Sequence, residues 1–230
     1  MLFDLHLHSR FSVDALTRPE TIVKICKKNN WGFALTDHNN MGAYVGTKSI
    51  AKLAKKEGVF CIPSEEIKVL SSDGKGKTEG EVIAYFLNSP IIPSTFEEIL
   101  DSVRKQGALL SCPHPFDWPR KNFKSFPKCY KEFDAMELYN ARAYYSGLNK
   151  KSQKFYQNPK VMSSIAGFGV SDAHTPEEIG NGLTEIDAVN ESEFRREVKK
   201  RRTRVIARFK SSFWHHFETQ LAKRNLMRAR

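Results

Sequence analysis

Residues 1–10 read MLFDLHLHSR, an apolar run that ends on two histidines separated by one residue. The apolar residues predict a strand over residues 1–7. Because alternate residues of a strand point to the same side, His6 and His8 can face one point at the end of that strand. Apolar runs that end in polar, metal-binding side chains recur along the chain, and this recurrence predicts the fold class.

Strand-like runs alternate with amphipathic helical stretches along most of the sequence. We expect strands over residues 1–7, 33–36, 59–63, 82–87, 109–112, 135–139 and 161–170, and helices over residues 19–28, 43–57, 94–106, 190–200 and 213–228. Strands separated by single helices pair in parallel, so the pattern predicts an α/β fold of repeated strand–helix units. In such folds the chemically active residues collect at the carboxyl ends of the strands.

Side chains able to bind metal ions follow the predicted strands. They are His6, His8, Asp37, His38, Glu65, Glu66, His114, Glu137, Asp172 and His174. Neutral imidazoles and carboxylates are ligands of zinc, manganese and iron. The four cysteines are widely spaced and form no CxxC pair, which argues against a thiolate site and against a disulfide framework. The repeated placement of such groups at strand ends therefore predicts a metal site.

Several of these segments, in this order, resemble the motifs of the PHP family, the polymerase and histidinol phosphatase superfamily. The segments are His6-Leu7-His8, Thr36-Asp37-His38, Pro63–Ile67, Pro113-His114-Pro115 and Ser171-Asp172-Ala173-His174. The resemblance runs from about residue 2 to about residue 186. It implies a distorted (β/α)7 barrel with two or three metal ions at the strand ends. We expect a PHP-like metallophosphoesterase domain at residues 1–193, followed by a basic C-terminal helical extension at residues 194–230.

The resemblance also implies a set of metal ligands. The first metal would take His6, His8 and Asp172, the second His114 and Glu81, and the third Asp14, His38 and His174, with Glu66 bridging the first two. In the PSEEI segment the family's glutamate falls on the second of the two, so Glu66 is chosen over Glu65. Many family members carry a histidine where Glu81 stands, and Asp14 stands where members have either Asp or His.

The charge of this ligand set indicates what it can bind. Its four carboxylates are negative and its five histidines are neutral, so two divalent ions would neutralise it and three would leave +2, which suits a phosphate dianion. A hydroxide that bridges two metals is the expected nucleophile, because metal binding lowers the pKa of water toward neutrality. Asp172 and His174 are candidates for assisting protonation of the leaving group. Arg142, which follows a predicted strand, is the candidate for clamping a phosphate bidentately.

Other polar and aromatic residues near the motifs are expected to lie around the metal site without binding metal. Asp37 is expected to orient a ligand, with a surface salt bridge as the alternative. Arg10, Arg120 and Lys121 lie in loops on the expected active face and are weaker candidates than Arg142 for the phosphate contact. Each of them, taken singly, is expected to be an exposed, solvated charge. Trp118 is the aromatic residue expected nearest the substrate.

The net charge of +11 lies in the C-terminal segment. Residues 194–230 contain thirteen Lys or Arg and two Glu, so the rest of the chain is close to neutral. Such a segment suggests an anionic partner such as nucleic acid, or a solvated helix that keeps the protein soluble. His215 and His216 are adjacent and do not share a helix face, so they are expected to be exposed tail residues. The glycines of residues 71–80, SSDGKGKTEG, predict a hairpin turn rather than a P-loop.

Composition excludes several classes of protein. The chain has 230 residues, of which 40% are hydrophobic and 27% charged, and this is ordinary globular composition. It contains no run of 18 apolar residues and no signal-peptide pattern, so we expect no membrane association. Widely spaced, reduced thiols favour a cytoplasmic protein.

The leading hypothesis is a metal-dependent phosphoesterase acting on a small phosphorylated metabolite or a nucleotide. The first alternative is a nuclease acting on RNA or DNA ends, with the basic tail following the nucleic-acid backbone. A metal-dependent amidohydrolase is a more distant alternative, because no lysine is clearly placed as a bridging ligand. A non-catalytic binding module is the last alternative, and the nearly complete ligand set argues against it.

Overall fold

The strands of the protein form one sheet in the computed structural model, which describes residues 1–46 and 49–228. Within these residues the sheet has nine strands in the order β7-β6-β5-β4-β3-β2-β1-β8-β9. The strands are β1 (Leu2–Leu7), β2 (Trp31–Leu35), β3 (Cys61–Leu70), β4 (Thr78–Tyr85), β5 (Leu109–Cys112), β6 (Ala135–Asn140), β7 (Ala166–Val170), β8 (Gly182–Ile186) and β9 (Thr203–Ala207).

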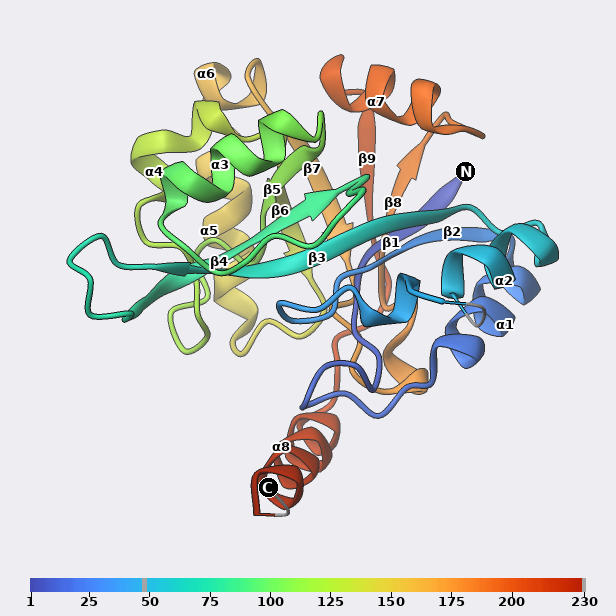
Figure 1. Ribbon diagram of the computed structural model, residues 1–230. Coiled ribbons are helices and arrows are strands. Elements are labelled where there is room, and N and C mark those ends of the chain that lie inside the picture. The colour runs from blue at the N-terminus through green and yellow to red at the C-terminus, as the bar shows by residue number, and fades with distance from the viewer. Residues whose placement is uncertain (47–48, 229–230) are drawn as a thin grey trace.

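Helices cover the outside of this sheet (Figure 1). They are α1 (Pro19–Asn29), α2 (Ile50–Glu57), α3 (Phe96–Lys105), α4 (Phe126–Cys129), α5 (Ser146–Tyr156), α6 (Pro159–Met162), α7 (Glu191–Lys199) and α8 (Phe213–Arg228), with short 3-10 turns at Gly42–Tyr44, Tyr130–Glu132 and Pro176–Glu178. Local sequence sets several helix ends: Pro19 begins α1, and a capping box between Thr95 and Glu98 begins α3. Helix α8 lies apart from the others, at the opposite end of the molecule from α7 (Figure 1).

The sheet curls until its two ends nearly meet, which gives the molecule a barrel. Thr184 Oγ1 on β8 accepts a hydrogen bond of 3.0 Å from the backbone N–H of Gly169 on β7. Thr203 Oγ1 on β9 donates to the carbonyl of Gly167 on β7 at 2.8 Å. A Cβ atom at Gly169 would lie 2.7 Å from the carbonyl oxygen of Leu183, so the strands can approach this closely only because residue 169 is glycine. The expected α/β barrel is confirmed.

Parallel pairing, expected for strands separated by single helices, does not extend to the whole sheet. Strand β4 pairs antiparallel with both β3 and β5. Strands β8 and β9, which the apolar pattern does not predict, pair antiparallel with each other, and β8 pairs antiparallel with β1. The turn over residues 71–77 explains the first case, because it is too short for a crossover and forms the hairpin that the glycines predict.

Several predicted elements have different boundaries in the structure. The strands expected over residues 59–63 and 82–87 are the longer β3 and β4, so Glu65 and Glu66 lie within β3 rather than after it. Residues 161–165, expected to begin a strand, complete α6 and a turn, and the strand starts at Ala166. The helix expected over residues 43–57 is a 3-10 turn at Gly42–Tyr44 followed by α2, with residues 47–48 outside the described part of the chain.

The basic segment of residues 194–230 contains three different elements. It includes most of α7, strand β9 and helix α8. Strand β9 pairs with β8 from Gly182↔Ala207 to Ile186↔Thr203, so this part of the segment belongs to the sheet. Along the described residues no helix is long and apolar enough to cross a bilayer.

Candidate metal centre

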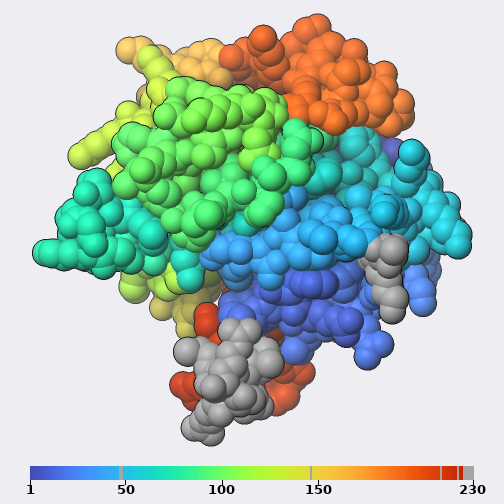
Figure 2. Space-filling model, in the orientation of Figure 1, coloured from blue at the N-terminus to red at the C-terminus, as the bar shows by residue number. Residues whose placement is uncertain are grey.

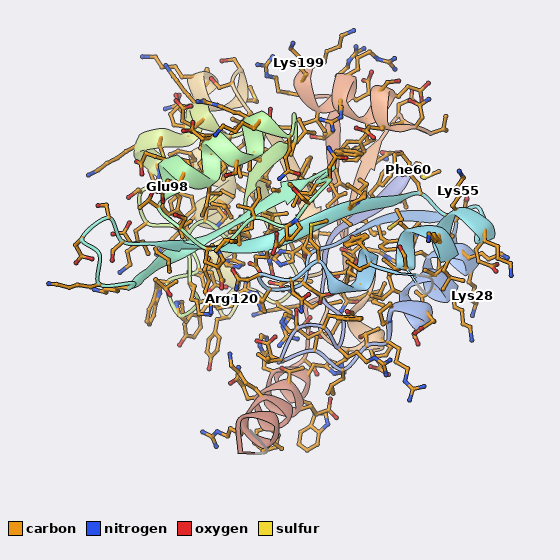
Figure 3. All side chains as sticks on the ribbon, viewed as in Figure 1. Lys28, Lys55, Phe60, Glu98, Arg120 and Lys199 are labelled. Atoms are coloured by element: carbon orange, nitrogen blue, oxygen red, sulfur yellow. The ribbon has the colours of Figure 1, made fainter. Side chains whose placement is uncertain are left out.

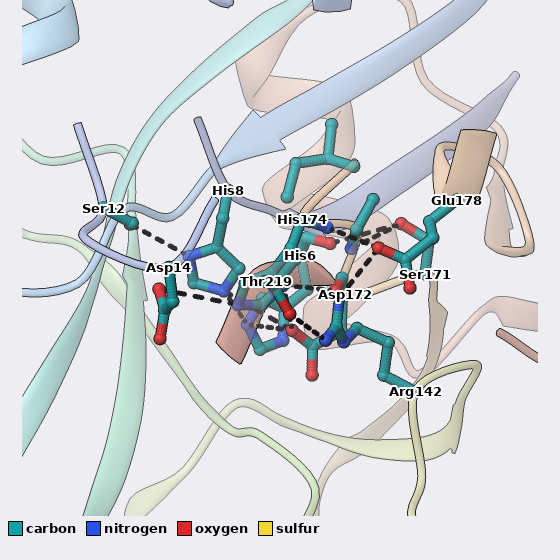
Figure 4. A network of polar contacts seen from close by, with 12 residues as sticks. His6, His8, Ser12, Asp14, Arg142, Ser171, Asp172, His174, Glu178 and Thr219 are labelled. Carbon is teal, nitrogen blue, oxygen red and sulfur yellow. Dashed lines mark hydrogen bonds and ion pairs between the residues drawn. The ribbon is translucent and has the colours of Figure 1, made fainter. Parts of the chain in front are cut away.

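A cleft of about 250 Å³ opens at the carboxyl ends of the parallel strands. The expected ligands that line it are Asp14, His38, Glu66, Glu81, His114, Asp172 and His174. The other two ligands are fully buried: His6, near the end of β1, is 0% exposed, and His8, just after β1, is 1% exposed. The structure therefore brings all nine expected ligands to one end of the barrel, where Figure 4 shows several of them.

Four side chains converge around the expected first metal position. His6 Nε2 lies 3.0 Å from His8 Nε2, and Asp172 Oδ1 lies 3.5 Å from each of these nitrogens. Glu66 Oε2 lies 3.5 Å from His6 Nε2 and 3.4 Å from His8 Nε2. Acceptor atoms that face one another at such distances suit a cation placed between them.

Glu66 also reaches the expected second group, as a bridging ligand would. Its Oε1 lies 3.2 Å from His114 Nε2, and its Oε2 lies 2.8 Å from His38 Nδ1. Glu81 Oε1 lies 4.0 Å from the same nitrogen of His38. Glu66 is 1% exposed and its carboxylate contacts imidazoles of both groups, so it lies at the centre of the cluster.

The expected third group lies on the solvent side of the cluster. Asp14 Oδ1 is 3.5 Å from His38 Nε2 and 3.8 Å from His174 Nε2. The ring centroid of His8 lies 4.4 Å from that of His38 and 4.2 Å from that of His174. These residues come from three loops that follow β1, β2 and β7.

Buried polar atoms without partners show that the donor set fits divalent metal ions. Among the described residues, Asp14 Oδ1 and His114 Nδ1 are buried and make no hydrogen bond, and the buried atoms His38 Nδ1 and Glu66 Oε2 have only their 2.8 Å contact with each other and the neighbouring imidazoles. A buried polar atom without a partner costs free energy, and a cation bound among these imidazoles and carboxylates would satisfy them. Nitrogen and oxygen donors without thiolates are the ligands expected for zinc, manganese or iron.

The electrostatics of the site lead to the same conclusion. Burial acts to raise the pKa of Asp172, yet the nearby His6 and Arg120 hold it well below its ordinary value. Burial acts to lower the pKa of His38, but Glu66, Glu81 and Asp14 raise it to about 9. Burial together with Arg142 lowers the pKa of His174, which keeps this imidazole neutral. The site therefore concentrates ionised carboxylates that require positive charge.

Two of the expected ligands have unusual backbone conformations. His114 has φ 30° and Asp172 has φ 55°, in the left-handed region that non-glycine residues seldom adopt. Backbone strain of this kind persists where the surrounding structure fixes a functional side chain. Glu137 Oε2 accepts the backbone N–H of His114 at 2.7 Å, and Asn140 Nδ2 donates to Asp172 Oδ2 at 3.0 Å.

Residues behind the ligands orient them. Glu137 Oε1 lies 2.7 Å from His6 Nδ1, which fixes the other ring nitrogen toward the cluster. Asp37 accepts hydrogen bonds from Ser9 and Ser12, and the hydroxyl of Ser12 lies 3.3 Å from His8 Nδ1. Asp37 is 1% exposed, so the alternative of a surface salt bridge is wrong. Glu137 was expected near a strand end, whereas no motif in the sequence indicated a role for Asn140.

Arg142 lies in the cleft wall with its guanidinium already engaged. Its Nη1 donates to Glu178 at 2.8 Å, and its Nη2 donates to Thr219 Oγ1 at 3.1 Å (Figure 4). Glu178 also accepts the backbone N–H of His174 at 2.9 Å. Arg142, in the loop after β6, therefore links Glu178 of the loop after β7 to Thr219 of α8. The phosphate contact expected for Arg142 stays a prediction.

Arg120 and His216 were expected to be exposed, and both expectations are wrong. The Arg120 side chain is 20% exposed, contacts Asp172 and Asp117, and lies at the same end of the barrel as the cleft (Figure 3). His216 lines the cleft, with Nδ1 3.3 Å from Arg142 Nη2, because α8 folds back toward the barrel. No local signal in a basic tail reveals such a long-range contact.

The remaining expectations have mixed outcomes. Arg10 is exposed as expected, whereas Lys121, 47% exposed, forms a salt bridge of 3.2 Å with Glu81. His215 is 22% exposed, less than expected for a tail residue. Trp118 is 65% exposed and stacks on Tyr145 with ring centroids 6.2 Å apart. Its proximity to substrate stays a prediction.

Comparison with known proteins identifies the family. Residues 4–165 match the family described as PHP domain, and residues 148–203 match the family described as PHP-associated. The chain belongs to the PHP family. This chain is 34% identical over 198 residues to the uncharacterized protein MJ0417 of Methanocaldococcus jannaschii, and the match covers 83% of this chain and 72% of that protein.

Solved structures share the PHP barrel. A two-domain protein of Bacteroides vulgatus, containing a predicted PHP-like metal-dependent phosphoesterase, superposes with a TM-score of 0.68 at 19% identity. The match covers 90% of this chain and 65% of that one, so this chain spans just under two thirds of the two-domain protein. Endonuclease Q, in complex with a 27-mer duplex carrying an abasic lesion, superposes with a TM-score of 0.57 at 19% identity, covering 87% and 57% of the two chains. At these identities the likeness shows the fold.

Proposed function

We propose that this PHP protein hydrolyses a phosphate ester of a small metabolite or a nucleotide, using divalent metal ions held by the nine clustered ligands. The observation that carries this proposal is the buried carboxylate of Glu66, whose two oxygens contact imidazoles of two adjacent ligand groups. Bound metal ions supply a Lewis acid for phosphoryl oxygens and a water of lowered pKa. The cysteine thiols are not needed as nucleophiles.

The protein's own residues complete the site around the phosphate. Arg120 lines the cleft, and its buried Nη2 has no hydrogen-bond partner among the described residues, so this group can donate to a phosphoryl oxygen when the side chain turns toward the cleft. Arg142 adds a second positive charge in the cleft wall. Glu137 and Asn140 hold His6 and Asp172 in place, and a fixed geometry of this kind lowers the cost of reaching the transition state.

Phosphate release by the manganese-loaded protein tests the proposal. The substrates are small phosphate esters and mononucleotides, compared with short RNA and DNA oligomers, and Asp172→Asn is the inactive control. We expect release from small esters that disappears in the variant. Absence of any mutant-sensitive phosphate release from any substrate would contradict the proposed function.

A nuclease acting on RNA or DNA ends is the second candidate function, supported by the fold likeness to endonuclease Q and by the basic C-terminal segment. Lys199 of that segment lies at the end of the barrel opposite Arg120, away from the cleft (Figure 3). Shortening of oligomers without release from small esters would favour the nuclease. The amidohydrolase alternative gains no support from the two lysines that line the cleft, because Lys121 and Lys223 each contact one carboxylate and bridge none.

A further inference from the structure

Helix α8 forms one wall of the cleft. His216, Thr219, Gln220 and Lys223, which lie on one face of the helix, line it. Figure 2 shows α8 in red at the bottom of the molecule, next to the blue N-terminal segment that carries Asp14. The opposite face of α8 presents Trp214 and Phe217, which are 62% and 45% exposed. The helix therefore turns its polar face to the site and its apolar face to solvent.

Two lysines border the cleft from different elements, and each pairs with an expected metal ligand. Lys223 Nζ lies 3.5 Å from Asp14 Oδ2, and Lys121 Nζ lies 3.2 Å from Glu81 Oε1. Their side chains are 33% and 47% exposed, so both ammonium groups remain accessible from the cleft mouth. A lysine is a flexible, mobile point charge, and it can leave a carboxylate whose charge a metal ion has neutralised.

We propose that Lys223 of α8, with Lys121 on the other border of the cleft, binds a second anionic group of the substrate, apart from the phosphate that reacts at the metal cluster. This inference rests on the proposed function and specifies its substrate class: a molecule with two separated anionic groups. A cleft of about 250 Å³ closed on one side by a helix fits a small molecule or a chain end. Lys223 is then a specificity-determining residue.

The test uses equilibrium binding and needs no turnover. Isothermal titration calorimetry of the full-length, manganese-loaded protein compares methylphosphonate with 1,3-propanediphosphonate, two probes that cannot be hydrolysed. The wild-type protein is expected to bind the diphosphonate about fivefold more tightly than the monophosphonate, because a partly exposed ion pair contributes a modest free energy. Lys223→Ala should remove most of that preference, and Lys121→Ala should reduce it, with monophosphonate affinity unchanged in both variants.

Matched variants separate a local contact from the general charge of the helix. Arg224→Ala removes one positive charge from an exposed position next to Lys223 and should keep the wild-type preference. Lys223→Arg should restore it. Equal affinity of the wild-type protein for both probes, or an equal loss in Arg224→Ala, would overturn the inference.

The two proposals fail independently. If phosphate esters are hydrolysed but the diphosphonate preference is absent, the proposed function stands and the role of Lys223 is rejected. If the preference depends on Lys223 but no ester is hydrolysed, the anion site stands and the proposed function is rejected.

Discussion

Glu66 and Glu65 are adjacent acidic residues with different surroundings, because neighbouring residues of strand β3 point to opposite faces. Glu66 contacts His6, His8, His38 and His114, whereas Glu65 Oε2 accepts the backbone N–H of Ile91 at 2.9 Å. Both side chains are 1% exposed. The pair therefore provides a matched comparison of a metal ligand with a structural carboxylate.

Replacing Glu66 by glutamine should remove metal binding and activity together. We expect activity to fall by about a hundredfold or more. Even the loss of a residue that only orients a metal ligand typically lowers metal affinity or activity by about 10- to 100-fold, and Glu66 is expected to be a ligand itself. Phosphate release and metal content by mass spectrometry measure the two effects. Glu65→Gln should retain both, and a similar loss of metal in Glu65→Gln would argue against the assignment of Glu66.

Arg120 is predicted to act on the substrate rather than on the metals. Arg120→Ala should lower kcat/KM by about 10- to 100-fold, the range expected when a charged hydrogen-bond donor to phosphate is lost. The metal content should stay at the wild-type level. Arg10→Ala, at an exposed position, is the control and should change neither quantity. Unchanged kinetics of Arg120→Ala would remove this residue from the site.

The cysteine thiols should react slowly with an alkylating reagent such as iodoacetamide. Burial raises the pKa of Cys26 and Cys112 well above the ordinary value and raises that of Cys61 to about 12, and burial also raises the pKa of Cys129. At pH 8 the thiols of Cys26, Cys61 and Cys112 are then almost wholly protonated, and the protonated form is not the nucleophile. Iodoacetamide should leave activity unchanged, with little labelling by mass spectrometry. Rapid inactivation would contradict this assignment.

At the scale of elements, the closure of the barrel depends on how closely β7 approaches β8 and β9. A Cβ at residue 169 would meet Leu183 O at 2.7 Å and Val205 Cγ1 at 2.8 Å. Gly169→Ala should therefore lower the free energy of unfolding by about 1–3 kcal/mol, the usual cost of overpacking a core. Gly147→Ala, on α5 with nothing within 4 Å, should be neutral or stabilising. Urea denaturation measures both, and an equal effect of the two would contradict the close approach.

The sequence predicts elements well where local pattern decides them. The helix that begins at Pro19, the strand Leu109–Cys112 and the helix Phe213–Arg228 agree with the expected ranges because proline, apolar runs and helical periodicity act over a few residues. Strands β8 and β9 have short, partly polar sequences, GLTEI and TRVIA, and they are stabilised by pairing with each other and, for β8, with the distant β1. The antiparallel direction of β4 likewise follows from its hairpin connection to β3, which the alternation of strands and helices does not predict.

At the scale of the whole molecule, most of the candidate ligands could be predicted because they lie at or just after the ends of strands that meet at one edge of the barrel. His6 and Asp172 are far apart in sequence and come together in this way, whereas Glu66 lies within the long strand β3. The contacts of Arg120 with Asp172 and of Lys223 with Asp14 join loops and a terminal helix across the cleft. Such contacts depend on the tertiary arrangement, so no spacing in the sequence indicates them.

The central claim is that hydrolysis depends on metal ions in this cluster, and one titration tests it most directly. A chelator first strips the protein of metal and is then removed. The metal-free protein is titrated with manganese while phosphate release from a small ester is measured. The described donors form three overlapping groups of three side chains, and these groups predict no release without metal and a rise that saturates at two or three equivalents. Full activity of the stripped protein, or no activity at any manganese concentration, would contradict the account.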